Sequence, residues 1–166
     1  MQSLKEEILI IQKLTQNENY NSYWIYHASL IEEIGELAQA LKVEYNFIKH
    51  KELKESAASE CADVFVCCFM AFFGNGGKLE DIRTVSTLQH HTVTKNIFEL
   101  LAILSDAANA PVRFHNKYDI EFHLLYAASL AYEIYKQCGG IEQQFSEIVN
   151  KKLNKWDVNQ KNRLAL

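Results

Sequence analysis

Two pairs of acidic residues are the feature of this sequence best suited to chemistry. Glu33 and Glu36 form one pair, and Glu60 and Asp63 form the other. At about 100° per residue, the members of each pair fall together on one shoulder of an apolar helical stripe. If the two helices pack side by side, four carboxylates converge, and like charges within about 4 to 6 Å disfavour ionisation unless a cation lies between them. The spacing therefore predicts a metal site.

The ligand set favours a hard divalent cation. All four side chains offer oxygen atoms only, which suits Mg²⁺, with Mn²⁺ as a substitute, rather than zinc or copper. In proteins Mg²⁺ usually keeps water molecules and shares its coordination shell with substrate phosphates. We therefore expect phosphate chemistry at this site.

Helical periodicity runs through most of the chain, so the elements that position the acids are predicted to be helices. The expected helices span residues 3–14, 22–49, 53–73, 79–88, 92–109, 119–138 and 141–156. Pro111 is expected in a loop, and the tail after Asp157 is expected to fray. The predicted fold is an all-α bundle of six or seven helices, in a single domain of residues 1–166.

The composition agrees with a helical domain and excludes some functions. The chain has 166 residues, of which 48% are hydrophobic, and only one proline and six glycines, too few for a turn-rich β fold. A formal net charge of −4 gives no basis for general nucleic-acid binding. No membrane partner is expected, because the longest apolar stretch, Val64 to Phe73, is shorter than the roughly 18 residues that a membrane span needs.

The cysteines predict the compartment. The chain has four, all inside apolar helical segments and without the CxxC pairs of a zinc site. Buried, reduced thiols are typical of the cytosol, so we expect a cytoplasmic protein.

A weak internal repeat relates the first half of the chain, residues 1–90, to the second, residues 91–166. A shift of 63 positions matches Glu36-Leu37 with Glu99-Leu100, and Gly76-Gly77 with Gly139-Gly140. The other acids do not repeat. Their counterparts are Asn96, His123 and Tyr126. A degenerate duplication that supports the first half explains this pattern, and chance similarity between amphipathic helices is the alternative.

The two acidic segments resemble the signature of a known superfamily. Glu32-Glu33-Ile34-Gly35-Glu36-Leu37, followed by Glu60-Cys61-Ala62-Asp63-Val64, is similar to the EExxE and ExxD motifs of the all-α NTP pyrophosphohydrolases, which include MazG-like proteins and dimeric dUTPases. The resemblance covers roughly residues 23–73 and implies a four-helix core. It also implies hydrolysis of a nucleoside triphosphate between its α and β phosphates, which gives the monophosphate and pyrophosphate.

The resemblance implies a role for each acid. Glu33, Glu36, Glu60 and Asp63 would bind Mg²⁺, and Glu32 would act as the catalytic base or support the ligands from the second shell. The Trp- and Lys-rich segment that follows the first motif in dimeric dUTPases is replaced here by residues 43–49, which argues against strict dUTP specificity. By analogy we expect a pyrimidine deoxynucleotide, canonical or modified.

Three further residues are candidates for substrate binding. Members similar to the dUTPases often carry an aromatic residue near the base, which points to Trp24, with core or interface packing as the alternative. MazG-like proteins often place Lys or Arg after the motifs to reach the phosphates, which points to Lys152 and Lys155. The alternative for these lysines is that they complement the C-terminal end of the last helix.

Short helices leave apolar surface to cover, so a homodimer or higher homo-oligomer is expected. The alternative function is a catalytically silent helical module that oligomerises or regulates. A di-iron carboxylate bundle is a poorer match, since it needs Glu-x-x-His motifs on two helices and the sequence has none.

Overall fold

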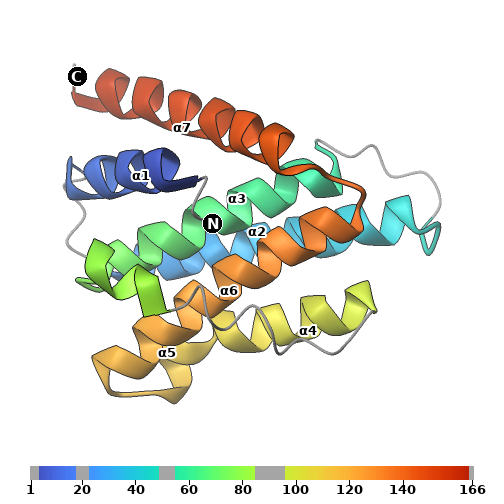
Figure 1. Ribbon diagram of the computed structural model, residues 1–166, viewed down its shortest axis with the longest axis horizontal. Coiled ribbons are helices and arrows are strands. Elements are labelled where there is room, and N and C mark those ends of the chain that lie inside the picture. The colour runs from blue at the N-terminus through green and yellow to red at the C-terminus, as the bar shows by residue number, and fades with distance from the viewer. Residues whose placement is uncertain (1–3, 18–22, 49–54, 85–95, 165–166) are drawn as a thin grey trace.

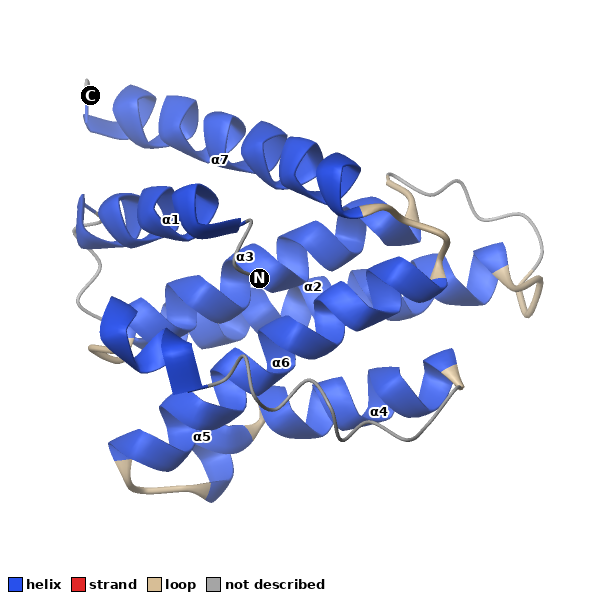
Figure 2. Ribbon diagram, viewed as in Figure 1, coloured by secondary structure: helices blue, strands red, loops and turns tan. Residues whose placement is uncertain are grey.

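The computed structural model describes residues 4–17, 23–48, 55–84 and 96–164. All regular structure in these ranges is helical, which confirms the predicted all-α fold (Figures 1 and 2). The seven α-helices of the described ranges, and one short 3-10 helix, are α1 Lys5–Asn17, α2 Tyr23–Glu44, α3 Ala57–Gly74, η2 Leu79–Thr84, α4 Ile97–Ala108, α5 Ala110–Arg113, α6 Lys117–Gln137 and α7 Glu142–Leu164.

Four helices form the centre of the bundle. α3 packs against α2 on one side and α6 on the other, and α4 covers α6 and also contacts α2. α3 is strongly apolar, and Phe65, Phe69 and Phe72 are fully buried along it. By length and composition α3 could cross a membrane, but 72% of its 18-residue apolar window is buried inside the protein. Its composition is therefore explained by its place in the core.

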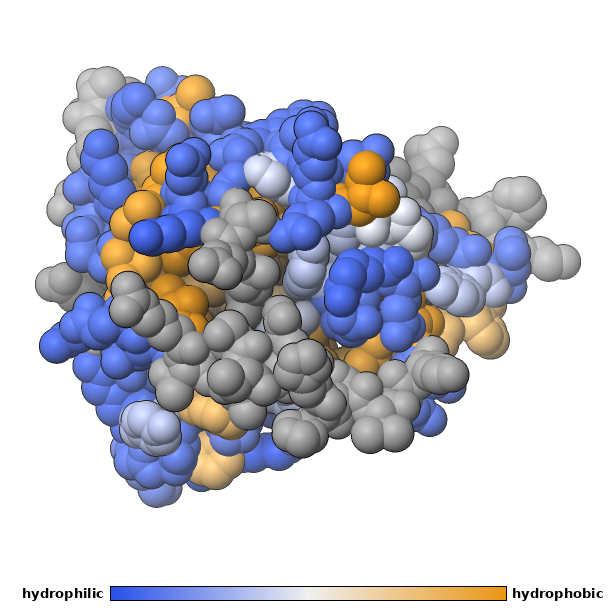
Figure 3. Space-filling view, viewed as in Figure 1, coloured by the Kyte–Doolittle hydropathy of each residue, from blue (hydrophilic) through white to orange (hydrophobic). Residues whose placement is uncertain are grey.

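The first and last helices, α1 and α7, lie together over α3 (Figure 1). Polar bonds join them. Asn150 Nδ2 donates to the buried Glu7 carboxylate over 2.9 Å, the Ser146 hydroxyl donates to the same oxygen, and Gln160 Nε2 donates to the Leu14 carbonyl over 3.1 Å. Hydrophilic side chains cover most of α7 in the view of Figure 3. These contacts hold α7 against α1, and both helices lie over α3.

The glycine pairs end two core helices in the same way. Gly76, after α3, has φ of 85°, and Gly139, after α6, has φ of 83°. The next glycine in each case donates its N–H back into the helix, Gly77 to the Phe72 carbonyl over 2.9 Å and Gly140 to the Tyr135 carbonyl over 3.1 Å. The positive φ is the left-handed conformation that favours glycine at a helix end. The two caps therefore keep the 63-residue spacing, while duplication as its cause stays a prediction.

Two expectations at the C-terminal side were wrong. α7 does not end at Trp156 but continues to Leu164, because Leu153 and Gln160 are buried and the Gln160 bond holds the last turns on α1. Pro111 is not in a loop. It lies in the first turn of α5, where a helix needs no N–H donor.

Other helix boundaries also differ from the expected ones. α2 ends at Glu44, short of residue 49, and Asn46 follows it with φ of 59°. α3 begins at Ala57 rather than at residue 53, because the Ser56 side chain caps it by accepting the Ser59 N–H. α4 begins at Ile97, after the cap residue Asn96. The predicted helical residues 3, 22, 49, 53–54, 85–88 and 92–95 lie outside the described ranges.

Candidate metal centre

Three of the four predicted acids form a cluster. One carboxylate oxygen each of Glu33, Glu36 and Glu60 lies within 4.8 Å of the others. Glu33 and Glu36 are one turn apart on the same side of α2, and Glu60 lies in the first turn of α3, which packs against α2. Oxygens bound to one octahedral Mg²⁺ lie roughly 3 to 4 Å apart, so small side-chain rotations would bring this cluster to coordination geometry. The three glutamates can therefore hold a metal ion.

The cluster is electrostatically unfavourable by itself. Burial raises the pKa of Glu33 to about 7, with further contributions from the nearby charges of Asp63 and Glu36. Burial, followed by the same two charges, also raises the pKa of Glu60 to about 7. At neutral pH these carboxylates are stabilised only by bound protons or by a cation. The donor set and its charge thus fit a hard divalent ion.

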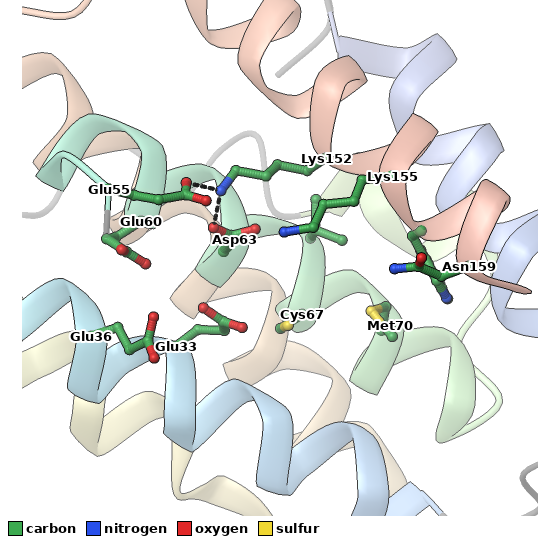
Figure 4. A pocket seen from close by; sticks show the side chains of 12 residues that line it. Glu33, Glu36, Glu55, Glu60, Asp63, Cys67, Met70, Lys152, Lys155 and Asn159 are labelled. Carbon is green, nitrogen blue, oxygen red and sulfur yellow. Dashed lines mark hydrogen bonds and ion pairs between the residues drawn. The ribbon is translucent and has the colours of Figure 1, made fainter. Parts of the chain in front are cut away.

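The fourth acid, Asp63, belongs to the same pocket but is paired differently. Its carboxylate accepts a hydrogen bond from Lys152 on α7, and the same ammonium group bonds Glu55 (Figure 4). Burial raises the pKa of Asp63, while Lys152 opposes that rise. Asp63 therefore stands beside the three-glutamate cluster, and its role as a fourth metal ligand stays a prediction.

Lys152 is held firmly as a cation. Its side chain is only 11% exposed, and although burial lowers its pKa, the bonds to Asp63 and Glu55 outweigh burial and raise it. Burial raises the pKa of Glu55, but hydrogen bonds from Lys152 and Ser59 outweigh that effect and lower it. Lys155 is exposed one turn further along α7 and points toward the same pocket (Figure 4). The structure therefore places both predicted lysines next to the acids.

These residues line one pocket of about 340 Å³, within the size range of small-molecule sites. Its lining comes from α2, from α3 with the residue just before its cap, and from α7. The lining residues are Glu33, Glu36, Glu55, Glu60, Asp63, Val66, Cys67, Met70, Lys152, Lys155, Trp156 and Asn159.

Sequence reasoning missed several of the lining residues. Trp156 and Asn159 follow Lys152 at spacings of four and seven, so they share its face of α7, and this helical spacing was the signal that could have found them. Asn159 was missed because the tail after Asp157 was expected to fray. Met70, which follows Asp63 at a spacing of seven on α3, carried the same signal.

Two predicted residues lie apart from the pocket lining. Trp24 is in the first turn of α2 with 57% of its surface exposed, and its ring packs against Tyr23 and His27. Glu32 is exposed on α2, close enough for its charge to help raise the pKa of Glu33. The structure does not bring Trp24 to the acids, and the roles of both residues stay predictions.

Comparisons of the chain with protein-family models, with curated proteins and with solved structures find no match. The fold and the site define an all-α helical protein with a cluster of three glutamates that can hold a metal ion.

Proposed function

We propose that this protein is a Mg²⁺-dependent nucleoside triphosphate pyrophosphohydrolase of the all-α superfamily, which includes MazG-like proteins and dimeric dUTPases. It cleaves the anhydride between the α and β phosphates and releases the monophosphate and pyrophosphate. The observation that carries the proposal is the cluster of Glu33, Glu36 and Glu60, whose oxygens lie within 4.8 Å of one another beside a pocket. The EExxE and ExxD motifs support it.

In this proposal Glu33, Glu36 and Glu60 hold Mg²⁺, or Mn²⁺ as a substitute, with Asp63 as a further ligand. When held there, the ion would supply positive charge to the triphosphate and acidify a water molecule. Lys152 and Lys155 offer the phosphates positive charge from α7, on the other side of the pocket from α2. The chain thus surrounds the reacting anhydride with charges of both signs.

Glu32 is the proposed general base. It is exposed to solvent next to Glu33, and its negative charge helps to raise the pKa of Glu33. An exposed carboxylate outside the metal cluster can orient a water molecule and accept its proton, because it is not itself a ligand of the ion. No covalent nucleophile is required.

The proposed substrate is a pyrimidine deoxynucleotide, canonical or modified, and the proposed assembly is a homodimer or higher homo-oligomer. Apolar side chains on the outside of α2 support an assembly, because Trp24, Ile25 and Ile31 are 57%, 43% and 39% exposed. The four thiols are all free, which supports the proposed cytoplasmic location.

Product analysis tests the function. The purified protein is incubated with Mg²⁺ and a panel of NTPs and dNTPs in ¹⁸O-labelled water, and the products are identified by mass spectrometry. We expect monophosphate and pyrophosphate in equal amounts, and no reaction in EDTA. Glu36→Gln should abolish the reaction, whereas Glu6→Gln, which removes an exposed charge on α1, should leave it intact. Release of orthophosphate, or equal activity of both variants, would sink the proposal.

A further inference from the structure

The pocket has two chemically different ends. The acids and Lys152 lie at one end, and Cys67, Met70 and Asn159 lie at the other (Figure 4). In Figure 4 both walls run in the same direction, from Asp63 to Met70 along α3 and from Lys152 to Asn159 along α7. Seven residues of helix at 1.5 Å each make either wall about 10 Å long. A ligand held by the acids therefore has room to extend along the pocket.

The lining residues beyond the acids and lysines carry no formal charge. They are Val66, Cys67, Met70, Trp156 and Asn159. Burial keeps the pKa of the Cys67 thiol well above its ordinary value, so this residue stays neutral. Thioether, thiol and indole groups offer apolar, polarisable surface that suits a flat aromatic ring. The amide of Asn159 can both donate and accept hydrogen bonds.

We propose that this uncharged end of the pocket is the subsite for the nucleobase, with Trp156 as the stacking partner and Asn159 as a hydrogen-bonding partner for the base edge. The inference rests on the proposed function, since it assumes that the acids hold the metal-bound phosphates. The length of each wall then matches the separation between the phosphates and the base of an extended nucleotide. The base is bound by α7, and Trp24 at the start of α2 is not its partner.

Intrinsic fluorescence distinguishes the two indoles, because the chain has only two tryptophans. Trp24→Phe leaves Trp156 as the reporter, and Trp156→Phe leaves Trp24. Each variant is titrated, in Mg²⁺, with the non-hydrolysable α,β-imido analogues of dCTP, dTTP and dATP, and with tripolyphosphate, which has no base. We expect the analogues, but not tripolyphosphate, to quench the Trp24→Phe protein and to leave the Trp156→Phe protein unquenched. The reverse pattern would place the base at Trp24 and overturn the inference.

Affinity measurements test the energetic role of Trp156. Base stacking on an aromatic side chain predicts that Trp156→Ala weakens binding of the imido analogues roughly 10-fold or more. Binding of Mg²⁺ tripolyphosphate should stay within about twofold of the wild type, and Trp156→Phe should restore most of the affinity for the analogues. The control is Val158→Ala, which alters an exposed residue of the same helix. Equal losses for the analogues and tripolyphosphate would show that Trp156 only supports the fold.

The outcomes separate this inference from the proposed function. If the wild type binds no analogue in the presence of Mg²⁺, both are wrong. If the wild type binds and hydrolyses triphosphates as proposed, but Trp156→Ala binds the analogues unchanged, the function stands and the base subsite is wrong. If Trp156→Ala does not fold, as judged by circular dichroism, the fluorescence of the two conservative variants still decides.

Discussion

Two helix pairs in this molecule share a scaffold but differ in charge. α2 with α3, and α4 with α6, are both packed pairs, and α3 and α6 end in equivalent glycine caps 63 residues apart. The first pair carries the cluster of three glutamates. In the second pair, the positions that correspond to Glu33, Glu36, Glu60 and Asp63 are occupied by Asn96, Glu99, His123 and Tyr126.

Two of the counterpart residues have ordinary structural contacts. The Asn96 side chain caps α4 by accepting the Phe98 N–H over 3.0 Å, and His123 Nδ1 lies 2.7 Å from the Asp119 carbonyl oxygen. A helix pair of this kind therefore needs no acid cluster to form. The first pair keeps its acids although burial and mutual repulsion raise their pKa values, and perturbed acids of this kind concentrate at functional sites. The difference supports a functional origin for the cluster.

The largest effect is expected when an acid of the first helix pair is replaced, with its counterpart in the second pair as the control. Glu36→Gln should lower Mg²⁺ affinity and pyrophosphate release by at least about 100-fold, because it replaces a charged carboxylate with a neutral amide that keeps only one oxygen. Glu99→Gln, at the corresponding position of the second pair, should change neither by more than twofold. Isothermal titration with Mg²⁺ and a pyrophosphate assay measure both effects. Similar losses in the two variants would end the contrast between the pairs.

The pH dependence of stability is the next largest effect. Glu33 and Glu60 have pKa values of about 7 in the folded protein, above the ordinary 4.5, so the folded chain binds more protons than the unfolded chain between these values. The free energy of unfolding should therefore fall as pH rises from 4.5 through 7, by about 2 kcal/mol after allowance for solvent screening. Urea denaturation in EDTA measures this fall.

Two controls locate the source of that fall. Saturating Mg²⁺ should remove most of it, and Glu33→Gln should remove about half, whereas Glu99→Gln should leave it unchanged. A metal-free protein that becomes more stable across this pH range would contradict the raised pKa values.

A smaller effect is expected at Lys152. Lys152→Met leaves Asp63 and Glu55 without their shared cation, so the free energy of unfolding should fall by about 1.5 kcal/mol, less than for a fully buried pair. Mg²⁺ affinity should rise, since a competing positive charge is gone. Lys155→Met, at an exposed position, should alter stability little. Weaker Mg²⁺ binding by Lys152→Met would show that Lys152 instead holds the acids in place for the ion.

The smallest effect tests the equivalence of the two caps. Gly76→Ala and Gly139→Ala force alanine into φ of 85° and 83°, which should lower the free energy of unfolding by about 1 kcal/mol each. The new methyl group meets nothing within 4 Å at position 139. At position 76 it meets only the end of the Lys117 side chain, which donates to the Gly76 carbonyl and can shift. Thermal denaturation compares the two. A loss confined to one variant would show that the caps are not equivalent.

The sequence alone predicted those features that depend on neighbouring residues of one helix. Helical spacing alone placed Glu33 beside Glu36, and Glu60 beside Asp63, because the period of a helix fixes which side chains share a face. Glu60 joins Glu33 and Glu36 only because α3 packs against α2. The sequence was insufficient where a distant helix decides the outcome. The Lys152 bond to Asp63 joins residues 89 positions apart. Which tryptophan lines the pocket depends on how α7 lies across α3, and no local pattern encodes that packing.

The separation between Asp63 and Lys152 also has a consequence for synthesis. Chains grow from the N-terminus at roughly 5 to 20 residues per second, so the 89 positions between these residues take about 4 to 18 s to make. During that interval the acids have emerged but Lys152 has not. If a cation occupies the cluster of three glutamates during that interval, it would offset their charge before Lys152 is made.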